Sequence, residues 1–362
     1  MIANRDALQC ISTVYVLCIS TGTFLQKTIS LPQKKKLITA SDIFAISSQK
    51  QFEKIALKVF RFQYENNLVY QEFCDLLKTN PQKVKSLHQI PFLPIQFFKS
   101  HNVVSNSDSI ETTFTSSGTT GAITSKHLIT DVSIYEESYR KGFSQFYGNI
   151  EDYVVLALLP SYLEREGSSL IHMVEDLIQL TNNSDSGFYL HNHEELIQKL
   201  IELDKAGQNV ILIGVTYALL DLIEKRTFNL QHTIIMETGG MKGKRKEMIR
   251  EELHQELCAG FGVTAIHSEY GMTELLSQAY SLGNGIFECP SWMQIHIRDT
   301  EDALTYIKDG KTGGINVIDL ANINSCSFIA TQDLGKKYPN TTFEVLGRFD
   351  NSDIRGCNLM VI

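Results

Sequence analysis

The stretch from Phe114 to Lys126 carries the residue types with the most evident chemistry. It reads Phe-Thr-Ser-Ser-Gly-Thr-Thr-Gly-Ala-Ile-Thr-Ser-Lys, and seven of its first eight residues are Ser, Thr or Gly. Hydroxyl groups, exposed backbone N–H groups and glycines that accept positive φ together suit a loop that cradles phosphate. It is neither a Walker loop, since no Gly-Lys-Ser/Thr closes it, nor a G-x-G-x-x-G dinucleotide loop. A flexible surface loop of the same composition is the alternative that the residues alone leave open.

Two polar turns follow apolar segments further along the chain. Glu237-Thr-Gly-Gly240 comes directly after segment 232–236, and His267-Ser-Glu-Tyr-Gly-Met-Thr-Glu274 comes directly after segment 262–266. In a parallel sheet, ligands bind in the crevice at the carboxyl ends of the strands. If both segments are strands, their turns lie where a ligand of the hydroxyl-rich loop would bind.

The segments that must position these turns alternate between apolar runs and amphipathic stretches. This alternation predicts an α/β fold with a parallel sheet covered by helices on both faces. The last third of the chain has shorter apolar segments split by turns, which predicts a β-rich subregion. The expected strands are residues 153–159, 209–215, 232–236 and 262–266 in the first region, and 292–297, 314–320 and 343–346 in the second.

Composition argues against several classes of protein. The 362 residues carry a formal net charge of −8 without a long basic stripe, so nucleic acid is not an expected partner. Seven cysteines without a Cys-x-x-Cys pair fit neither a zinc site nor a disulfide framework, and favour a reducing cytoplasm. The stretch from Cys10 to Leu25 is too short and too polar for a transmembrane helix, although a signal peptide stays an alternative. We expect residues 1–36 to be a loosely ordered extension and residues 37–362 to form the compact domain.

Several pieces of the chain, taken in order, resemble the motifs of adenylate-forming enzymes. These pieces are Thr115 to Lys126, Tyr270-Gly-Met-Thr-Glu274, and Thr331-Gln-Asp333 with Gly347-Arg-Phe-Asp350. Others look like the acyl-protein synthetase (LuxE-type) branch: Pro91-Phe-Leu-Pro-Ile95 with Phe98-Lys-Ser-His101, Leu159-Pro-Ser-Tyr-Leu-Glu-Arg165 with Gly167-Ser-Ser-Leu170, and Arg355-Gly-Cys-Asn-Leu359. The resemblance covers the chain from about Ile38 onward. It implies the large N-terminal domain of that fold, with the C-terminal lid domain and its lysine missing. The proline that usually precedes the lysine of the phosphate loop is replaced by Ser125.

The resemblance implies a ligase that uses ATP and Mg²⁺ to convert a fatty-acid-like carboxylate into an acyl-adenylate, and then transfers the acyl group to a thiol. Implied partners are the carboxylic acid and either an acyl-acceptor protein or reductase, or coenzyme A. Matching positions would bind the phosphates (Ser116, Ser117, Gly118, Thr119, Thr120, Gly121 and Lys126), border adenine (Gly239, Gly240, Tyr270, Gly271 and Met272), contact the α-phosphate (Thr273), hold Mg²⁺ (Glu274) and bind ribose or phosphate (Asp333 and Arg348).

A thiol is the best acyl acceptor among the side chains. In LuxE-type enzymes a cysteine near the C-terminus carries the acyl group, and Cys357 matches that position. Arg355, two residues away, favours the thiolate. The resemblance therefore assigns catalytic roles to Cys357, Thr273 and Lys126.

The residues alone leave plainer alternatives open. Cys357 suits a packed apolar tail, Glu274 a helix cap and Asp333 a turn. His127 and His267 border the motifs, but a lone histidine is more often structural than catalytic. A ligase that delivers the acyl group to coenzyme A or a carrier protein is the alternative activity. A non-catalytic nucleotide- or acyl-binding subunit is the second alternative, while a serine hydrolase is disfavoured because no G-x-S-x-G elbow is present.

Overall fold

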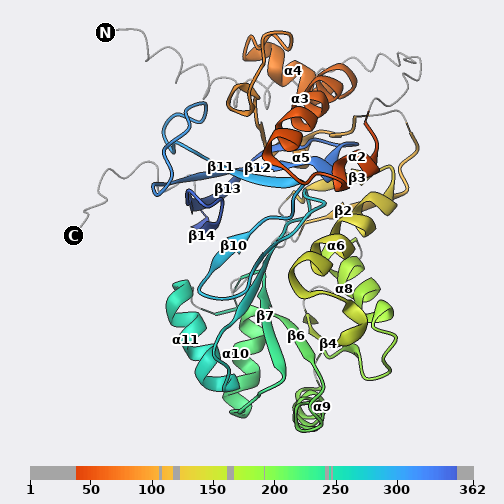
Figure 1. Ribbon diagram of the computed structural model, residues 1–362, viewed down its shortest axis with the longest axis vertical. Coiled ribbons are helices and arrows are strands. Elements are labelled where there is room, and N and C mark those ends of the chain that lie inside the picture. Colours follow the sequence, from red (N-terminus) through yellow and green to blue (C-terminus); the bar gives the residue numbers. More distant parts are fainter. Residues whose placement is uncertain are drawn as a thin grey trace, which may run out of the picture.

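A computed structural model describes residues 38–105, 108–116, 123–160, 167–190, 192–240, 244–245 and 248–348 (Figure 1). The expected extension lies outside these ranges. So do the predicted site residues Ser117, Gly118, Thr119, Thr120, Gly121 and Cys357. The other predicted site residues lie within the described ranges.

The parallel half of the main sheet is built from strands with apolar side chains on both faces. Its order is β5-β4-β6-β7-β8, and all these neighbours are parallel. Every residue of β4 and β6 is buried, as expected for strands between two layers of helices. Helices α6 and α8 lie on one side of these strands, and α10 and α11 on the other (Figure 1). The bounds are β4 (Val154–Leu158), β5 (Gly187–Phe188), β6 (Val210–Val215), β7 (Thr233–Thr238), β8 (His267–Tyr270), α6 (Val132–Tyr147), η2 (Ile150–Asp152), α8 (Ser169–Leu180), α9 (His193–Lys205), α10 (Thr216–Lys225) and α11 (Arg250–Phe261).

The antiparallel half continues the same sheet beyond β8. Its order is β8-β9-β10-β14-β13-β12-β11, with antiparallel neighbours throughout. This half contains the β-rich subregion that the sequence predicts. The bounds are β9 (Ala279–Ser281), β10 (Ile286–Glu288), β11 (Met293–Arg298), β12 (Thr312–Asp319), η3 (Leu320–Asn322), β13 (Phe328–Lys337) and β14 (Phe343–Arg348).

The N-terminal helices cover the antiparallel half (Figure 1). The rings of Phe60 and Tyr70 pack on Phe328 of β13, with centroid distances of 6.3 Å and 6.1 Å. The buried Gln63 side chain donates to Asn322 O and accepts from Ser327 N, which ties α3 to the turn before β13. The bounds are α2 (Ala40–Phe44), α3 (Gln49–Asn66), α4 (Leu68–Leu76), η1 (Leu87–Gln89), β1 (Leu93–Pro94) and α5 (Phe97–Ser100), followed by a separate hairpin of β2 (Thr112–Thr115) and β3 (Lys126–Ile129).

One predicted strand is wrong. Residues 262–266 form a connection, and the strand β8 begins only at His267. The reason is Gly262, which caps α11 with a φ of +68° in the left-handed region, so the chain must turn before it can extend. Glu237 and Thr238 likewise belong to β7. Glu237 and Thr238 therefore lie buried at the end of β7, and residues 267–270 form β8 itself, in which all but the half-buried His267 are buried.

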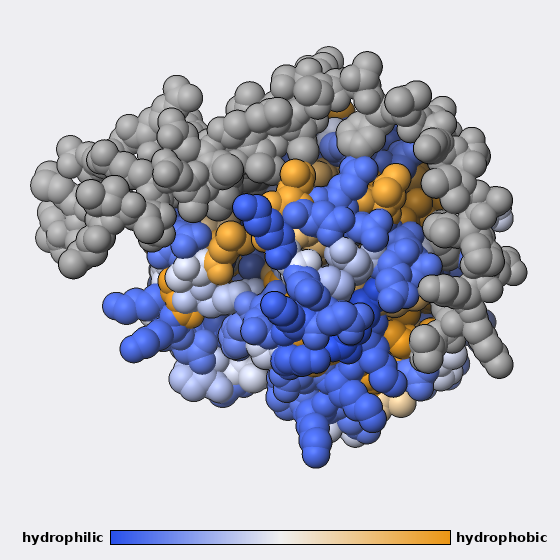
Figure 2. Space-filling model, turned by 90° about the horizontal axis from the view of Figure 1, so that it is seen from above, coloured by the Kyte–Doolittle hydropathy of each residue, from blue (hydrophilic) through white to orange (hydrophobic). Residues whose placement is uncertain are grey.

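The face of the molecule shown in Figure 2 is mostly hydrophilic, and its hydrophobic residues form small separate groups. Within the described ranges, none of the helices has both the length and the apolar composition that crossing a membrane requires.

Candidate active site

The hairpin of β2 and β3 carries the hydroxyl-rich loop. Thr115 and Lys126 form its last strand pair. Ser116 N then donates to Ser125 O at 3.1 Å, and Ser125 N donates to Ser116 Oγ at 2.9 Å, so the base of the loop is closed. Lys126 is exposed at this base, whereas Ser125 is buried. Because residues 117–122 lie outside the described ranges, the phosphate contacts of the loop stay a prediction.

Two buried side chains hold the backbone of Thr273 and Glu274. His127 Nδ1 lies 2.8 Å from Thr273 O, and Asn322 Nδ2 donates to Glu274 O at 2.7 Å. A carbonyl oxygen can only accept, so the hydrogen of the His127 ring is on Nδ1. Burial lowers the pKa of His127 to about 4, which keeps the ring neutral. We call His127 and Asn322 the carbonyl clamp.

Leu276 and Ser277, which follow Glu274 in the chain, are held by a side chain of the antiparallel half. The Asp319 carboxylate accepts from Leu276 N at 2.7 Å and from Ser277 Oγ at 2.6 Å. Burial raises the pKa of Asp319 to about 6, while these donors oppose the rise. The whole stretch from Thr273 to Ser277 is therefore fixed by side chains of β3, β12 and η3.

Glu274 has the surroundings expected of a cation ligand. Its side chain is 5% exposed, and it forms no ion pair within 4 Å in the described part of the chain. Burial raises the pKa of Glu274, whereas a hydrogen bond with Ser125 and the charges of Arg348 and Lys99 lower it. No cluster of three metal-ligating side chains exists among the described residues. One carboxylate is nevertheless enough for Mg²⁺, which takes most of its other ligands from water and phosphate.

Asp333 and Arg348 meet across neighbouring strands of the antiparallel half. They are directly paired between β13 and β14, and Arg348 Nε lies 3.3 Å from Asp333 Oδ1. The other carboxylate oxygen of Asp333 accepts from Tyr270 Oη at 2.8 Å. Asp333 is buried, while the Arg348 side chain is 77% exposed and free to reach a ligand. Tyr270 thus connects the end of β8 to both charged residues.

The Gly239–Gly240 turn follows β7 beside this group. Gly239 has a φ of +70°, a conformation that L side chains rarely adopt, and a Cβ at Gly240 would meet no atom of the described residues within 4 Å. Thr216 Oγ1 lies 3.3 Å from both Gly239 O and Glu237 Oε2. Glu237 in turn pairs with Arg250 at 2.5 Å. Thr216 therefore holds the Gly239–Gly240 turn, and the described residues leave open space beside Gly240.

Glu269 is a buried acid that the sequence analysis did not single out. Desolvation raises its pKa to about 7, although the Thr238 hydroxyl donates to it. A Cβ at residue 271 would lie 2.4 Å from Glu269 Oε1, which explains the need for Gly271. Glu269 also lines a small cavity of about 20 Å³ with Phe143, Val155, Met173, Val174, Leu177, Ile211, Ile213, Met236 and Tyr280. Its position directly before the Tyr-Gly-Met-Thr-Glu motif is the signal that could have identified it.

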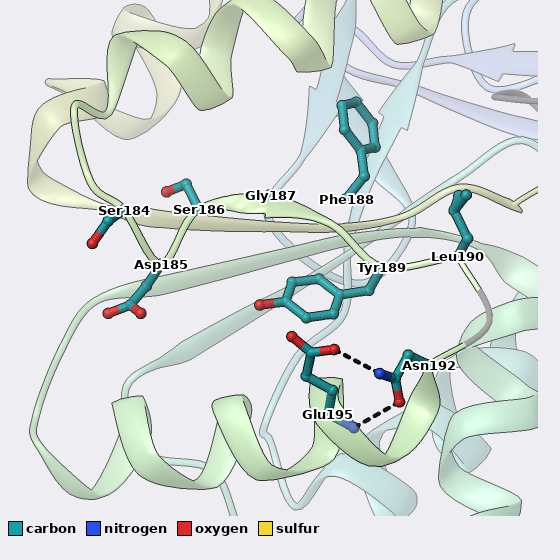
Figure 3. Close-up of a pocket in the computed structure, with 9 residues that line it drawn as sticks. All are labelled: Ser184, Asp185, Ser186, Gly187, Phe188, Tyr189, Leu190, Asn192 and Glu195. Carbon is teal, nitrogen blue, oxygen red and sulfur yellow. Dashed lines mark hydrogen bonds between the residues drawn. The ribbon is translucent and has the colours of Figure 1, made fainter.

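A separate hollow lies elsewhere, at the edge of the sheet beside β5 (Figure 3). It measures about 420 Å³ and runs along residues 184–190 above the start of α9. There Asn192 Nδ2 donates to Glu195 Oε2 at 2.6 Å. None of the predicted site residues lines it. Since β5 is four strands from β8 in the sheet, the hollow is roughly 19 Å from the candidate site.

The structure therefore brings together several of the predicted site residues that lie in the described ranges. Thr273, Glu274, Tyr270, Asp333 and Arg348 share contacts or charges as described above. The sequence analysis missed Asn322, Asp319 and Glu269, which support this group from the core, and Lys99, whose charge reaches Glu274. His267 is half-buried, and its Nδ1 lies 3.2 Å from Tyr147 Oη. This contact fits a structural role for His267.

The chain is similar to several known proteins. The family model described as acyl-protein synthetase, LuxE, matches residues 24–362. A long-chain-fatty-acid–luciferin-component ligase of Vibrio harveyi is 24% identical over 343 residues, which are 87% of this chain and 89% of that protein. An open conformation of 2-hydroxyisobutyryl-CoA ligase has a TM-score of 0.60 at 12% identity, with 83% of this chain and 70% of that chain covered.

A second match has a lower score. ATP-bound MatB of Rhodopseudomonas palustris has a TM-score of 0.49 at 16% identity and covers 67% of this chain. The chain spans about half the length of that protein, 49%. The likeness to 2-hydroxyisobutyryl-CoA ligase confirms the predicted fold class, an α/β domain of the kind found in adenylate-forming ligases.

Proposed function

Since the chain belongs to the LuxE acyl-protein synthetase family, we propose that it uses ATP to activate a fatty or other carboxylic acid and passes the acyl group to a thiol. The substrate carboxylate attacks the α-phosphorus of ATP, the bond to pyrophosphate breaks, and an acyl-adenylate forms. A thiolate then attacks the acyl carbon, and AMP leaves with the electron pair of the broken C–O bond. The observation that carries the proposal is Glu274, a buried acid without an ion-pair partner in the described ranges, beside the base of the hydroxyl-rich loop.

Each group at the site has one task in this reaction. The hydroxyl-rich loop and Lys126 hold the phosphates, Thr273 contacts the α-phosphate, and Asp333 with Arg348 binds the ribose side of the nucleotide. The carbonyl clamp keeps Thr273 and Glu274 in place. Mg²⁺, when bound to Glu274, neutralises charge on the phosphates. Positioning and charge stabilisation of this kind suffice for nucleotidyl transfer, which needs no covalent participant from the protein before the thiol step.

We place the acyl tail at the cavity beside Glu269, which must widen to admit it. Glu269 is a residue of β8, and apart from Glu269 and the Tyr280 hydroxyl the lining of the cavity is apolar. At about 20 Å³ it has room for one water-sized group. A longer tail enters only if side chains move, and Met173 and Met236 are adaptable residues in its wall.

The acceptor thiol is Cys357. Burial raises the pKa of all four cysteines in the described ranges, namely Cys74, Cys258, Cys289 and Cys326. For Cys326 the value reaches about 12. Thiols of this kind are poor nucleophiles because the thiolate is the reactive form. We therefore place the acceptor at Cys357, the residue that matches the position of the acyl-carrying cysteine in the family.

Incubation with ATP, Mg²⁺ and a panel of labelled carboxylic acids tests this proposal. We expect a hydroxylamine-labile label on denatured wild type that is lost in Cys357→Ser and kept in Cys258→Ser. Label that survives in Cys357→Ser places the acceptor on another residue. Acid-dependent pyrophosphate release without any label supports coenzyme A or a carrier protein as the acceptor. Neither signal with any acid contradicts the proposed activity and leaves a binding protein.

A further inference from the structure

Lys99 lies on a short helix that is fixed from two sides of the candidate site. The strand before it, β1, pairs with β13, and Ile95 N donates to Ala330 O at 3.0 Å. The ring of Phe98 packs edge-on against the ring of His127, with 5.5 Å between centroids. His127 is the residue that holds Thr273 O. The next residue after Phe98 is therefore placed between the strand that carries Asp333 and the hairpin that carries the hydroxyl-rich loop.

The charge of Lys99 is available at this position. Its side chain is exposed and forms no ion pair within 4 Å in the ranges that the structure describes. It is nevertheless close enough to Glu274 to lower the pKa of that buried acid, as Arg348 also does. The two cations differ, however, because Arg348 is already bonded to Asp333. Lys99 thus follows Phe98, which contacts the His127 ring that holds Thr273 O, and among the described residues it has no carboxylate within 4 Å.

We infer that Lys99 binds the phosphate groups of ATP at the candidate site. The inference rests on the proposed function in that the site must bind ATP. A lysine ammonium is a compact charge with three donors on a flexible stem, which suits contact with phosphate oxygens. Glu274 attracts a cation and Lys99 an anion, so together they match a nucleotide phosphate with its metal ion.

The same position gives Lys99 a role in the chemical step. When the bond between the α-phosphorus and the bridging oxygen breaks, the electron pair goes to the pyrophosphate oxygen, where negative charge accumulates. A fixed cation beside that charge lowers the barrier without donating a proton. Lys99 is therefore a catalytic residue; the sequence analysis quoted it within Phe98-Lys-Ser-His101 but gave it no role.

Titration calorimetry with MgATP, in the absence of any carboxylic acid, tests the inference directly. We compare the wild type with Lys99→Ala, Lys99→Arg and the control Lys205→Ala, an exposed lysine at the end of α9 beside the opposite edge of the sheet. Loss of a charge-assisted contact predicts roughly ten- to a hundredfold weaker MgATP binding for Lys99→Ala. Lys99→Arg keeps the charge and should stay within about fivefold of wild type, and Lys205→Ala within about twofold.

The outcomes separate the inference from the proposed function. Binding by Lys99→Ala within about twofold of wild type overturns the inference. If Lys99→Ala does not fold, as judged by its melting temperature, the comparison of Lys99→Gln with Lys99→Arg decides instead. A wild type that binds MgATP through Lys99 but shows no acid-dependent exchange of labelled pyrophosphate contradicts only the proposed activity. A wild type that does not bind MgATP overturns both.

Discussion

The two halves of the main sheet meet at β8 and differ in what they bury. The parallel half buries almost only apolar side chains in β4 and β6, and its buried acids, Glu237 and Glu269, lie near the carboxyl ends of β7 and β8. The antiparallel half buries polar and charged side chains along its strands. These are Ser281, His296, Arg298, Asn316, Asp319, Thr331 and Asp333.

The difference in burial follows from how the polar groups are paired. Arg298 Nη1 donates to Asn316 Oδ1 at 2.8 Å and to Ile315 O at 2.6 Å, so its charge is accommodated inside the sheet. In the parallel half, Glu269 has only a hydroxyl donor and a like-charged neighbour, Glu237. A buried group without an opposite charge prefers its neutral form. The parallel half therefore supplies backbone, hydroxyl groups and one buried acid with a raised pKa, Glu269, and the antiparallel half supplies the charged pair of Asp333 and Arg348.

Glu274, at the boundary between the halves, gives the largest expected effect. In Glu274→Gln the shape stays but the cation ligand is lost, so we expect acid-dependent pyrophosphate exchange to fall by about 10²–10³-fold. Because burial raises the pKa of Glu274, removing its charge should leave the melting temperature equal or higher. The measurement is the exchange rate at saturating ATP together with a thermal melt.

The control for that variant is Glu195→Gln in the hollow at the edge of β5. We expect normal exchange, since this residue is bonded to Asn192 at the start of α9 and lines the hollow beside β5, the strand that is four strands from β8. A loss of exchange in Glu195→Gln with full exchange in Glu274→Gln would move the active site to the hollow.

The raised pKa of Glu269 should make the stability of the protein depend on pH. Its folded pKa of about 7 lies above the ordinary 4.5, so the stability that the neutral acid provides is complete below about pH 4.5 and is lost as the pH rises to 7. A difference of about 2.5 units corresponds to about 3 kcal/mol in the free energy of unfolding. Thr238 and Glu237 face the carboxyl, and Tyr135, Tyr147 and Tyr280 nearby stay neutral across this range.

Denaturant unfolding of wild type and Glu269→Gln at several pH values measures this difference. The wild type should lose stability relative to the variant between about pH 4.5 and 7 and run parallel to it above about pH 8. Glu288→Gln, an exposed acid on β10, is the control. A pH-independent difference between wild type and Glu269→Gln would show that the carboxyl is ionised throughout.

Within the parallel half, the strands were unequally predictable from the sequence. Continuous apolar runs identified β4, β6 and most of β7, because strands between two helix layers bury every side chain. The same reasoning failed for β8, whose residues His267 to Tyr270 are polar and are buried through specific partners such as Thr238. Periodicity cannot show such partners, because they come from a neighbouring strand.

Motifs located the candidate site better than periodicity did. Glu274, Asp333 and Arg348 were found by their types and order, and the structure places them together. The residues that hold them were not found. Asn322 and Asp319 act through hydrogen bonds to residues more than forty positions away in the sequence, and no local pattern marks a residue of this kind.

Substitutions of two buried histidines, His127 and His296, should have moderate effects on stability. His127 donates to Thr273 O, whereas His296 of β11 lies among the rings of His88 and Tyr306 with Nε2 unbonded in the described ranges. His127→Leu leaves a buried carbonyl without its donor and should cost about 1–3 kcal/mol. His296→Leu should be neutral or stabilising, because it removes an unpaired polar atom.

The carbonyl clamp predicts more than stability for His127. In His127→Asn the amide can still donate to Thr273 O, so we expect stability and pyrophosphate exchange to be largely restored relative to His127→Leu. Chemical denaturation and exchange rates of the three variants provide the measurement. Equal losses of exchange in His127→Asn and His127→Leu would mean that the ring itself, and not its hydrogen bond, positions the Thr273–Glu274 turn.

The smallest expected effects are those of alanine substitutions at the two glycines that follow β7. Gly239 has a φ of +70°, so Gly239→Ala should cost about 1–2 kcal/mol of folding free energy. A Cβ at Gly240 meets no atom of the described residues within 4 Å, so Gly240→Ala should change stability by less than about 0.5 kcal/mol. If the open space beside Gly240 receives the adenine ring, the same methyl group should weaken MgATP binding several-fold without any loss of stability. Unchanged MgATP binding in Gly240→Ala, measured by calorimetry, would place adenine away from this turn and leave the antiparallel half, through Asp333 and Arg348, to hold the nucleoside.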